Sequence, residues 1–142
     1  LLYSQSYVRL TPRWYKIPPQ EQGKLIGVGE GKSSNQDVAL KKAIMTANVQ
    51  LAEQMEPALT TITTRLNALA KGDEIVLQRV TRIRTSLKAE LKDTRIVQRA
   101  YKKTKKGYTA YVLIEMNADE IKSSFIEKAK EDTVLREFIV GL

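Results

Sequence analysis

Residues 25–31 read LIGVGEG, and this stretch decides the fold. In an extended chain successive side chains point to opposite faces, so Ile26 and Val28 share one face and the glycines line the other. A strand with a face free of side chains lets another backbone approach it closely. The sequence therefore predicts a strand here that receives a tightly packed helix. The structural glycines of this strand are Gly27, Gly29 and Gly31.

The next segment has the pattern of that helix. Ser33, Ser34 and Asn35 are of the types that cap helix N-termini, and Pro57 is of the type that ends or kinks a helix. Between them, apolar residues recur at steps of three and four, which is the spacing of one helical stripe. They are Leu40, Ala43, Ile44, Ala47, Leu51 and Met55. We expect a helix over residues 35–55 whose alanines pack on the glycine strand.

Farther along the chain the hydrophobic period changes. Apolar residues keep helical spacing through residues 59–69 and 76–91, and from residue 94 the period becomes two. Residues 94–103 and 108–116, joined by the turn TKKG, read as a β-hairpin. The face of the second strand that carries Tyr111 and Leu113 is half apolar, so we expect it to be covered.

These elements define a fold class. We expect an α+β protein with a small, mostly antiparallel sheet in a strand-helix-strand-strand core, with amphipathic helices packed on it and a C-terminal helix. The composition along the chain predicts three regions. These are a Pro-rich N-terminal arm at 1–23, an α+β domain at 24–130 and an apolar C-terminal tail at 131–142.

The composition argues against most enzyme classes. The chain has no Cys and no His, so it lacks a thiol nucleophile, an imidazole base and a Cys- or His-based metal site. The acidic pairs Glu53 with Glu56 and Asp119 with Glu120 lie in helical patterns rich in lysine, where solvated helix charges explain them. We expect no catalytic activity, no metal and no cofactor.

The segment GVGEGKS at residues 27–33 resembles a phosphate loop but lacks its spacing. That loop needs a glycine, then four residues, then Gly-Lys-Ser or Gly-Lys-Thr, so its first glycine would fall at position 26, which is Ile26. The third glycine also comes one residue too early for a dinucleotide-binding turn. We therefore expect no nucleotide binding, and interpret the segment as a glycine-faced strand that leads into a capped helix.

The positive charge of the chain is concentrated in less than a quarter of its length. The net charge is +8, and residues 76–107 hold eleven Lys or Arg against two Asp or Glu, so the rest of the chain is close to neutral. We predict a basic contact patch that comprises Arg79, Arg82, Arg84, Lys88, Arg95, Arg99, Lys102, Lys103, Lys105 and Lys106. Three interpretations stay open: a solvated face, contact with an anionic lipid or acidic protein surface, and nucleic acid, on which Tyr101, Tyr108 and Tyr111 would stack.

Both ends of the chain carry apolar and aromatic residues in patterns that suit no internal element. We expect them to provide contacts between copies, in a homo-oligomer that closes into a ring or continues as a disk or filament. The predicted assembly residues are Tyr3, Tyr7, Trp14, Tyr111, Leu113, Leu135, Phe138 and Ile139. The alternative is that both termini fold back on their own domain.

The order of motifs resembles a known family. Trp14 in a Pro-rich lead is followed by GVGEG at 27–31, an Ala-rich helix at 39–53, and a hairpin whose second strand is GYTAYVLIEM at 107–116. This is similar to the twenty-kilodalton outer-membrane lipoproteins of bacteria, which include flagellum-associated lipoproteins that form rings or disks. The resemblance spans about residues 14–130, and the family's lipid-accepting cysteine is absent here.

The resemblance implies a non-catalytic structural protein of the cell envelope, exported to the outer membrane, periplasm or cell surface. Its partners would be copies of itself, other envelope proteins or an anionic membrane, rather than nucleic acid. A basic module for nucleic acid or another polyanion is the alternative function. The chain begins at Leu1 without a Met or a signal segment, so we expect it to be a processed product.

Overall fold

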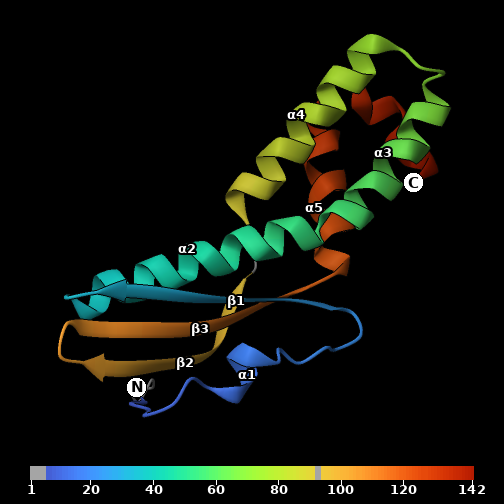
Figure 1. The fold of residues 1–142 in the computed structure, drawn as a ribbon. Coiled ribbons are helices and arrows are strands. Elements are labelled where there is room, and N and C mark those ends of the chain that lie inside the picture. The colour runs from blue at the N-terminus through green and yellow to red at the C-terminus, as the bar shows by residue number, and fades with distance from the viewer. Residues whose placement is uncertain (1–5, 92–93) are drawn as a thin grey trace. The chain divides into compact units, whose positions relative to one another are not determined.

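The computed structural model describes residues 6–91 and 94–142 (Figure 1). The chain divides into two compact units. Unit 1 comprises Leu1–Glu53 and Thr94–Met116, and unit 2 comprises Gln54–Asp93 and Asn117–Leu142. The expected boundaries at 23/24 and 130/131 do not coincide with this division.

Unit 1 is built on a three-stranded antiparallel sheet with the order β1-β3-β2 (Figure 1). Its strands are β1 (Lys24–Ser33), β2 (Arg95–Thr104) and β3 (Gly107–Asn117). Helix α2 (Gln36–Gln54) follows β1, and the short helix α1 (Arg13–Lys16) precedes it. The predicted α+β fold is confirmed, with each predicted strand within about two residues of its observed bounds.

The glycine face of β1 receives α2, as the sequence predicts. A Cβ placed on Gly27, Gly29 or Gly31 would overlap a backbone carbonyl oxygen of α2, and the carbonyls belong to successive alanines one turn apart. These alanines, Ala39, Ala43 and Ala47, are fully buried. Backbone-to-backbone packing this close is possible only because both surfaces lack large side chains.

The β2–β3 hairpin turns at Gly107, whose φ is +135°, a conformation that favours glycine. The strands pair with Arg99 opposite Val112 and with Tyr101 opposite Ala110, and the register shifts between Ile96 and Gln98. The missing side chain at Gly107 has a second use, because a Cβ there would lie 2.6 Å from Ser34 Cα. The hairpin turn therefore packs directly against the β1–α2 junction.

The second face of the sheet is covered by the chain's own N-terminal segment. Trp14 and Tyr15 pack on a cluster of Ile26, Val28 and Leu113. The rings of Tyr15 and Tyr111 are 5.1 Å apart, and the Tyr111 hydroxyl lies 3.3 Å from Thr11 Oγ1. The cover that the half-apolar face requires therefore comes from within the unit.

This packing corrects part of the predicted assembly surface. Tyr111 is 2% exposed and Leu113 is 3% exposed, so neither is free to contact another copy. Trp14 is half-buried against the same face. Of the other predicted N-terminal contacts, Tyr7 is exposed and Tyr3 lies outside the described residues.

Polar contacts protect the two edges of the sheet. At the β2 edge, Tyr7 forms a parallel bridge to Tyr101, with Val8 N donating to Tyr101 O at 2.8 Å. At the β1 edge, Val28 N donates to Gln50 Oε1 at 2.7 Å, and Lys42 Nζ donates to Lys32 O at 3.1 Å. Edge groups that are already bonded are poor templates for an added strand.

Unit 2 is helical. It contains α3 (Glu56–Leu69), α4 (Glu74–Glu90), α5 (Asp119–Lys130) and the 3₁₀ turns η1 (Leu135–Glu137) and η2 (Ile139–Gly141). Pro57 is in the first turn of α3, so α2 ends before it as predicted. The core of this unit includes Leu59, Leu66, Val80 and Phe125, which are fully buried.

The C-terminal tail folds back on unit 2. Leu135 is fully buried, and η1 packs against α4 and α5. Phe138 and Ile139 are half-buried, whereas Val140 is 91% exposed. The prediction that Leu135 contacts another copy is therefore wrong, because the tail completes the core of its own unit. Among the described helices, none is both long enough and apolar enough to cross a membrane.

Candidate functional site

The ten residues of the predicted basic patch divide between the units. Arg79, Arg82, Arg84 and Lys88 lie on α4 of unit 2, and the other six lie on the β2–β3 hairpin of unit 1. The two sets differ in how far their charge is compensated. That difference decides which of them can act as a contact surface.

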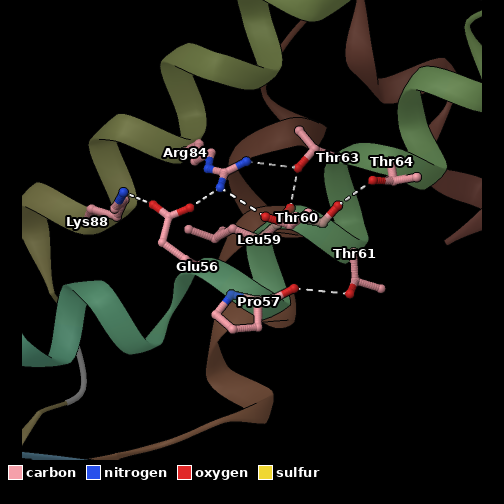
Figure 2. A network of polar contacts seen from close by, with 9 residues as sticks. All are labelled: Glu56, Pro57, Leu59, Thr60, Thr61, Thr63, Thr64, Arg84 and Lys88. Carbon is pink, nitrogen blue, oxygen red and sulfur yellow. Dashed lines mark hydrogen bonds and ion pairs between the residues drawn. The ribbon is translucent and has the colours of Figure 1, made fainter.

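Most of the α4 set is engaged in structural ion pairs. Arg84 and Lys88 both bind the carboxylate of Glu56 at the start of α3 (Figure 2). Arg84 also donates to Thr60 Oγ1 at 3.1 Å and to Thr63 Oγ1 at 3.3 Å. The sequence interpretation of Glu56 as a solvated charge is therefore wrong, because Glu56 joins α3 to α4.

The threonine cluster of α3 is accommodated by the helix backbone. Thr61 Oγ1 donates to Pro57 O at 3.0 Å and Thr64 Oγ1 donates to Thr60 O at 2.8 Å, each four residues back (Figure 2). Such bonds satisfy the hydroxyls without interrupting the helix. Thr60 and Thr63 thereby present oxygen atoms beside Arg84.

Arg79 has a structural partner of its own. Its guanidinium donates to Asp132 Oδ2 at 3.2 Å. Burial acts to raise the pKa of Asp132, but hydrogen bonds from the backbone N–H groups of Leu135 and Val134 and the charge of Arg79 outweigh it, so this pKa is lowered. Three of the four α4 residues therefore stabilise unit 2.

On the hairpin, Arg95 is compensated by a buried acid. Glu115 is 7% exposed on β3, where Arg95 binds it and Lys24 Nζ lies 3.4 Å from Oε1. The hydrogen bond from Arg95 is the main reason that the pKa of Glu115 is lowered, and Lys24 adds to the effect. This arrangement anchors the open end of the hairpin.

Four lysines lie at the other end of the hairpin, and their charge is not compensated by any acidic side chain that the structure describes. We call Lys102, Lys103, Lys105 and Lys106 the hairpin end. Within residues 6–91 and 94–142 none of them forms an ion pair, and all but half-buried Lys102 are exposed. Lys103 Nζ lies 5.9 Å from the ring centroid of Tyr108, at the distance of a cation–π contact.

Beside the hairpin end the surface is hollowed. The hollow has a volume of about 380 Å³ and lies where the turn meets the β1–α2 junction. Its lining residues are Lys32, Ser33, Ser34, Thr104, Lys106, Tyr108 and Thr109. The lining therefore holds two lysines, five residues that carry a hydroxyl group and no acidic residue.

The start of α2 is fixed close to this hollow. Asn35 Oδ1 accepts from Val38 N at 3.1 Å, and Ser33 Oγ accepts from Asn35 N at 3.1 Å. Of the three predicted capping residues, Asn35 therefore caps the helix, and Ser33 holds the backbone of that capping residue. The positive end of the dipole of a 19-residue helix lies beside Ser34, where it favours a bound anion.

Sequence reasoning missed the hollow. It named Lys106 and Tyr108 but not Lys32, Ser33, Ser34, Thr104 or Thr109 as site residues, because the two groups are about 70 positions apart. The segment 27–33, which resembles a phosphate loop without its spacing, ends at the β1–α2 junction that lines the hollow. Only the antiparallel pairing of β1 with β3 brings the junction and the turn together.

The three tyrosines predicted to stack on bases differ in how far they are exposed. Tyr101 and Tyr111 are each 2% exposed, so neither can stack on a nucleotide. Tyr108 is half-buried and lies beside Lys103. One tyrosine of the three is therefore accessible.

The described residues contain no group of three or more acidic side chains arranged to hold a metal ion. No protein-family model matches this chain, and no match to a curated protein is found. The resemblance to outer-membrane lipoproteins therefore stays a prediction from the sequence.

Proposed function

We propose that this protein is a non-catalytic structural component of the bacterial envelope that contacts an anionic surface through the hairpin end. The observation that carries the proposal is the clustering of four lysines at one hairpin turn, none of which forms an ion pair within residues 6–91 and 94–142, whereas most of the basic residues on α4 do. Uncompensated charge at one end of a rigid hairpin attracts polyanions over about a Debye length, roughly 8 Å at physiological salt.

A lipid or acidic protein surface suits this site better than nucleic acid. Binding to single strands relies on aromatic rings on which successive bases stack, and two of the three candidate rings are buried. The lysines instead form a compact cluster at a turn, which a planar anionic surface can approach without stacking. The family resemblance also favours the envelope.

The proposal is tested by vesicle co-sedimentation with an anionic phospholipid. Lys103→Glu with Lys105→Glu should abolish most binding at about 0.15 M salt, whereas wild-type binding should fall steeply as salt rises. The matched control is Arg82→Glu with Lys130→Glu, which makes the same change in net charge on exposed helix positions of unit 2. If both double variants lose binding equally, net charge rather than the hairpin end is responsible and the proposal fails.

Nucleic acid is tested in parallel. A gel shift with short DNA or RNA at about 0.15 M salt should show no tight complex. Tight binding to either polymer, with weaker binding to vesicles, would replace the envelope proposal with the polyanion-module alternative.

Self-association belongs to the same proposal and follows from the family resemblance. Because Tyr111, Leu113 and Leu135 are buried within their own units, a ring, disk or filament would have to use other surfaces. Sedimentation velocity of the wild-type chain should show species larger than the monomer. A monomer at high micromolar concentration would contradict this part of the proposal.

A further inference from the structure

We propose that the hollow between the hairpin turn and the β1–α2 junction is a binding site for a phosphate group. The inference rests on the proposed function, because it names the chemical group that an anionic surface would present to the hairpin end. It goes further in assigning a defined site rather than diffuse attraction. The proposed function predicts binding to anionic vesicles, and the hollow predicts binding of phosphate in solution, so the two can be tested separately.

The lining has the chemistry of a phosphate site. Lys32 and Lys106 supply positive charge from two segments far apart in the sequence, although Lys32 Nζ also lies 3.7 Å from Glu30 Oε1. Ser33, Ser34, Tyr108 and Thr109 add hydroxyl groups to the lining, whereas the Thr104 hydroxyl donates to Gly107 O. A phosphate group carries several strong acceptor oxygens, so it can use donors that converge from different elements. A site with this donor set and no carboxylate in its lining selects an anion.

Thr109 contributes an unbonded hydroxyl to the lining. It is only 6% exposed, yet its hydroxyl makes no hydrogen bond within residues 6–91 and 94–142. Since Thr109 lines the hollow, its hydroxyl can donate to a bound oxyanion.

The size of the hollow indicates what the phosphate is attached to. A volume of about 380 Å³ is at the lower end of the range of small-molecule sites, roughly 300–1,000 Å³, and exceeds what a bare ion fills. The ligand that we assign to the hollow is a phosphate monoester, either the headgroup of a lipid or a small soluble molecule. The flanking Lys103 and Lys105 would attract it without lining the site.

The first test titrates inorganic phosphate into the isotope-labelled protein and follows amide chemical shifts. We expect the largest shifts at Thr109, Lys106 and Ser34. Thr109→Val, which keeps the shape but removes the hydroxyl, and Lys106→Ala should each weaken binding by about tenfold or more, as expected for a lost hydrogen bond to a charged group. Thr109→Ser should retain most of the binding, which separates loss of the hydroxyl from disturbance of the fold.

The matched control is Lys105→Ala, which removes the same charge from the same turn at a position outside the lining. It should change phosphate affinity by about twofold at most, since exposed charges are screened. If Lys105→Ala weakens phosphate binding as much as Lys106→Ala, or if no shifts occur, the site does not exist. Vesicle binding through the hairpin end would survive that result, so the proposed function is judged separately.

The second test distinguishes the two sources of the phosphate. Vesicles that carry a phosphate-monoester lipid are compared with vesicles of a phosphodiester lipid at equal surface charge. A preference for the monoester that Thr109→Val removes assigns a lipid headgroup. Equal binding to both, with phosphate binding intact in solution, assigns a soluble phosphate monoester.

Discussion

Gly29 lies under the carbonyl group of Ala43 so closely that a Cβ on residue 29 would overlap the carbonyl oxygen and lie 2.7 Å from the amide nitrogen of Ala47. Both contacts are to backbone atoms of α2, which cannot rotate away as a side chain can. The separation of β1 from α2 is therefore set by the absence of a side chain at this position.

Gly29→Ala should lower the free energy of unfolding of unit 1 by about 1–3 kcal/mol or more, because overpacking forces the helix off the strand. Urea unfolding followed by the fluorescence of Trp14, the only tryptophan, measures this change. Ala43→Gly in the same chain should not restore stability, since the clash is with a carbonyl rather than with the alanine methyl. A full rescue would show that α2 does not pack on β1 in this way.

Trp14→Ala should destabilise unit 1 by about 2 kcal/mol, because it uncovers the cluster of Ile26, Val28 and Leu113. Circular dichroism on urea unfolding gives the value. Ile17→Ala is the control on the same segment. Because the Ile17 side chain is 66% exposed, this change should lower the free energy of unfolding by about 0.5 kcal/mol at most. If Trp14→Ala instead leaves stability unchanged and reduces the mass in solution, the N-terminal segment serves assembly.

Glu56→Ala should lower the free energy of unfolding of unit 2 by about 1 kcal/mol, because it removes the carboxylate that Arg84 and Lys88 share on a partly exposed surface. The loss should shrink in about 0.5 M salt, which screens the wild-type ion pairs. Thermal unfolding at low and high salt measures both effects. Glu53→Ala, at an exposed position, should change little, and an equal loss there would rule out the network as the cause.

Stability should fall in acid partly because Glu115 becomes protonated. Its folded-state pKa is lowered by Arg95 and Lys24, so it contributes stability above its ordinary pKa of about 4.3 and loses that contribution as pH falls through the lowered value. The Glu115→Gln variant should therefore unfold more easily than the wild type near pH 7. Its free energy of unfolding should also depend less on pH below about pH 5. Glu131→Gln, an exposed control, should keep the wild-type slope.

The basic patch shows where prediction from the sequence reached its limit. Counting charges located the excess between residues 76 and 107, but the sequence could not show that Glu56 would neutralise Arg84 and Lys88 or that Glu115 would bind Arg95. Those partners are 20 to 32 positions away, beyond the reach of helical or strand periodicity. With those partners assigned, the four lysines of the hairpin end are left together at the turn.

The sequence by itself determined the order and type of the elements around the sheet of unit 1, because local periodicity and glycine placement act within a few residues. The alternation at Ile26 and Val28 required a strand, and the alanine stripe required a helix that fits it. The tertiary structure alone decided what covers each surface. Trp14 covers the outer sheet face and Leu135 completes the core of unit 2, so residues that looked free along the chain are buried. Thr109 and Lys32 meet in one hollow only because β1 and β3 pair, and long-range pairing leaves no mark on the spacing of residues.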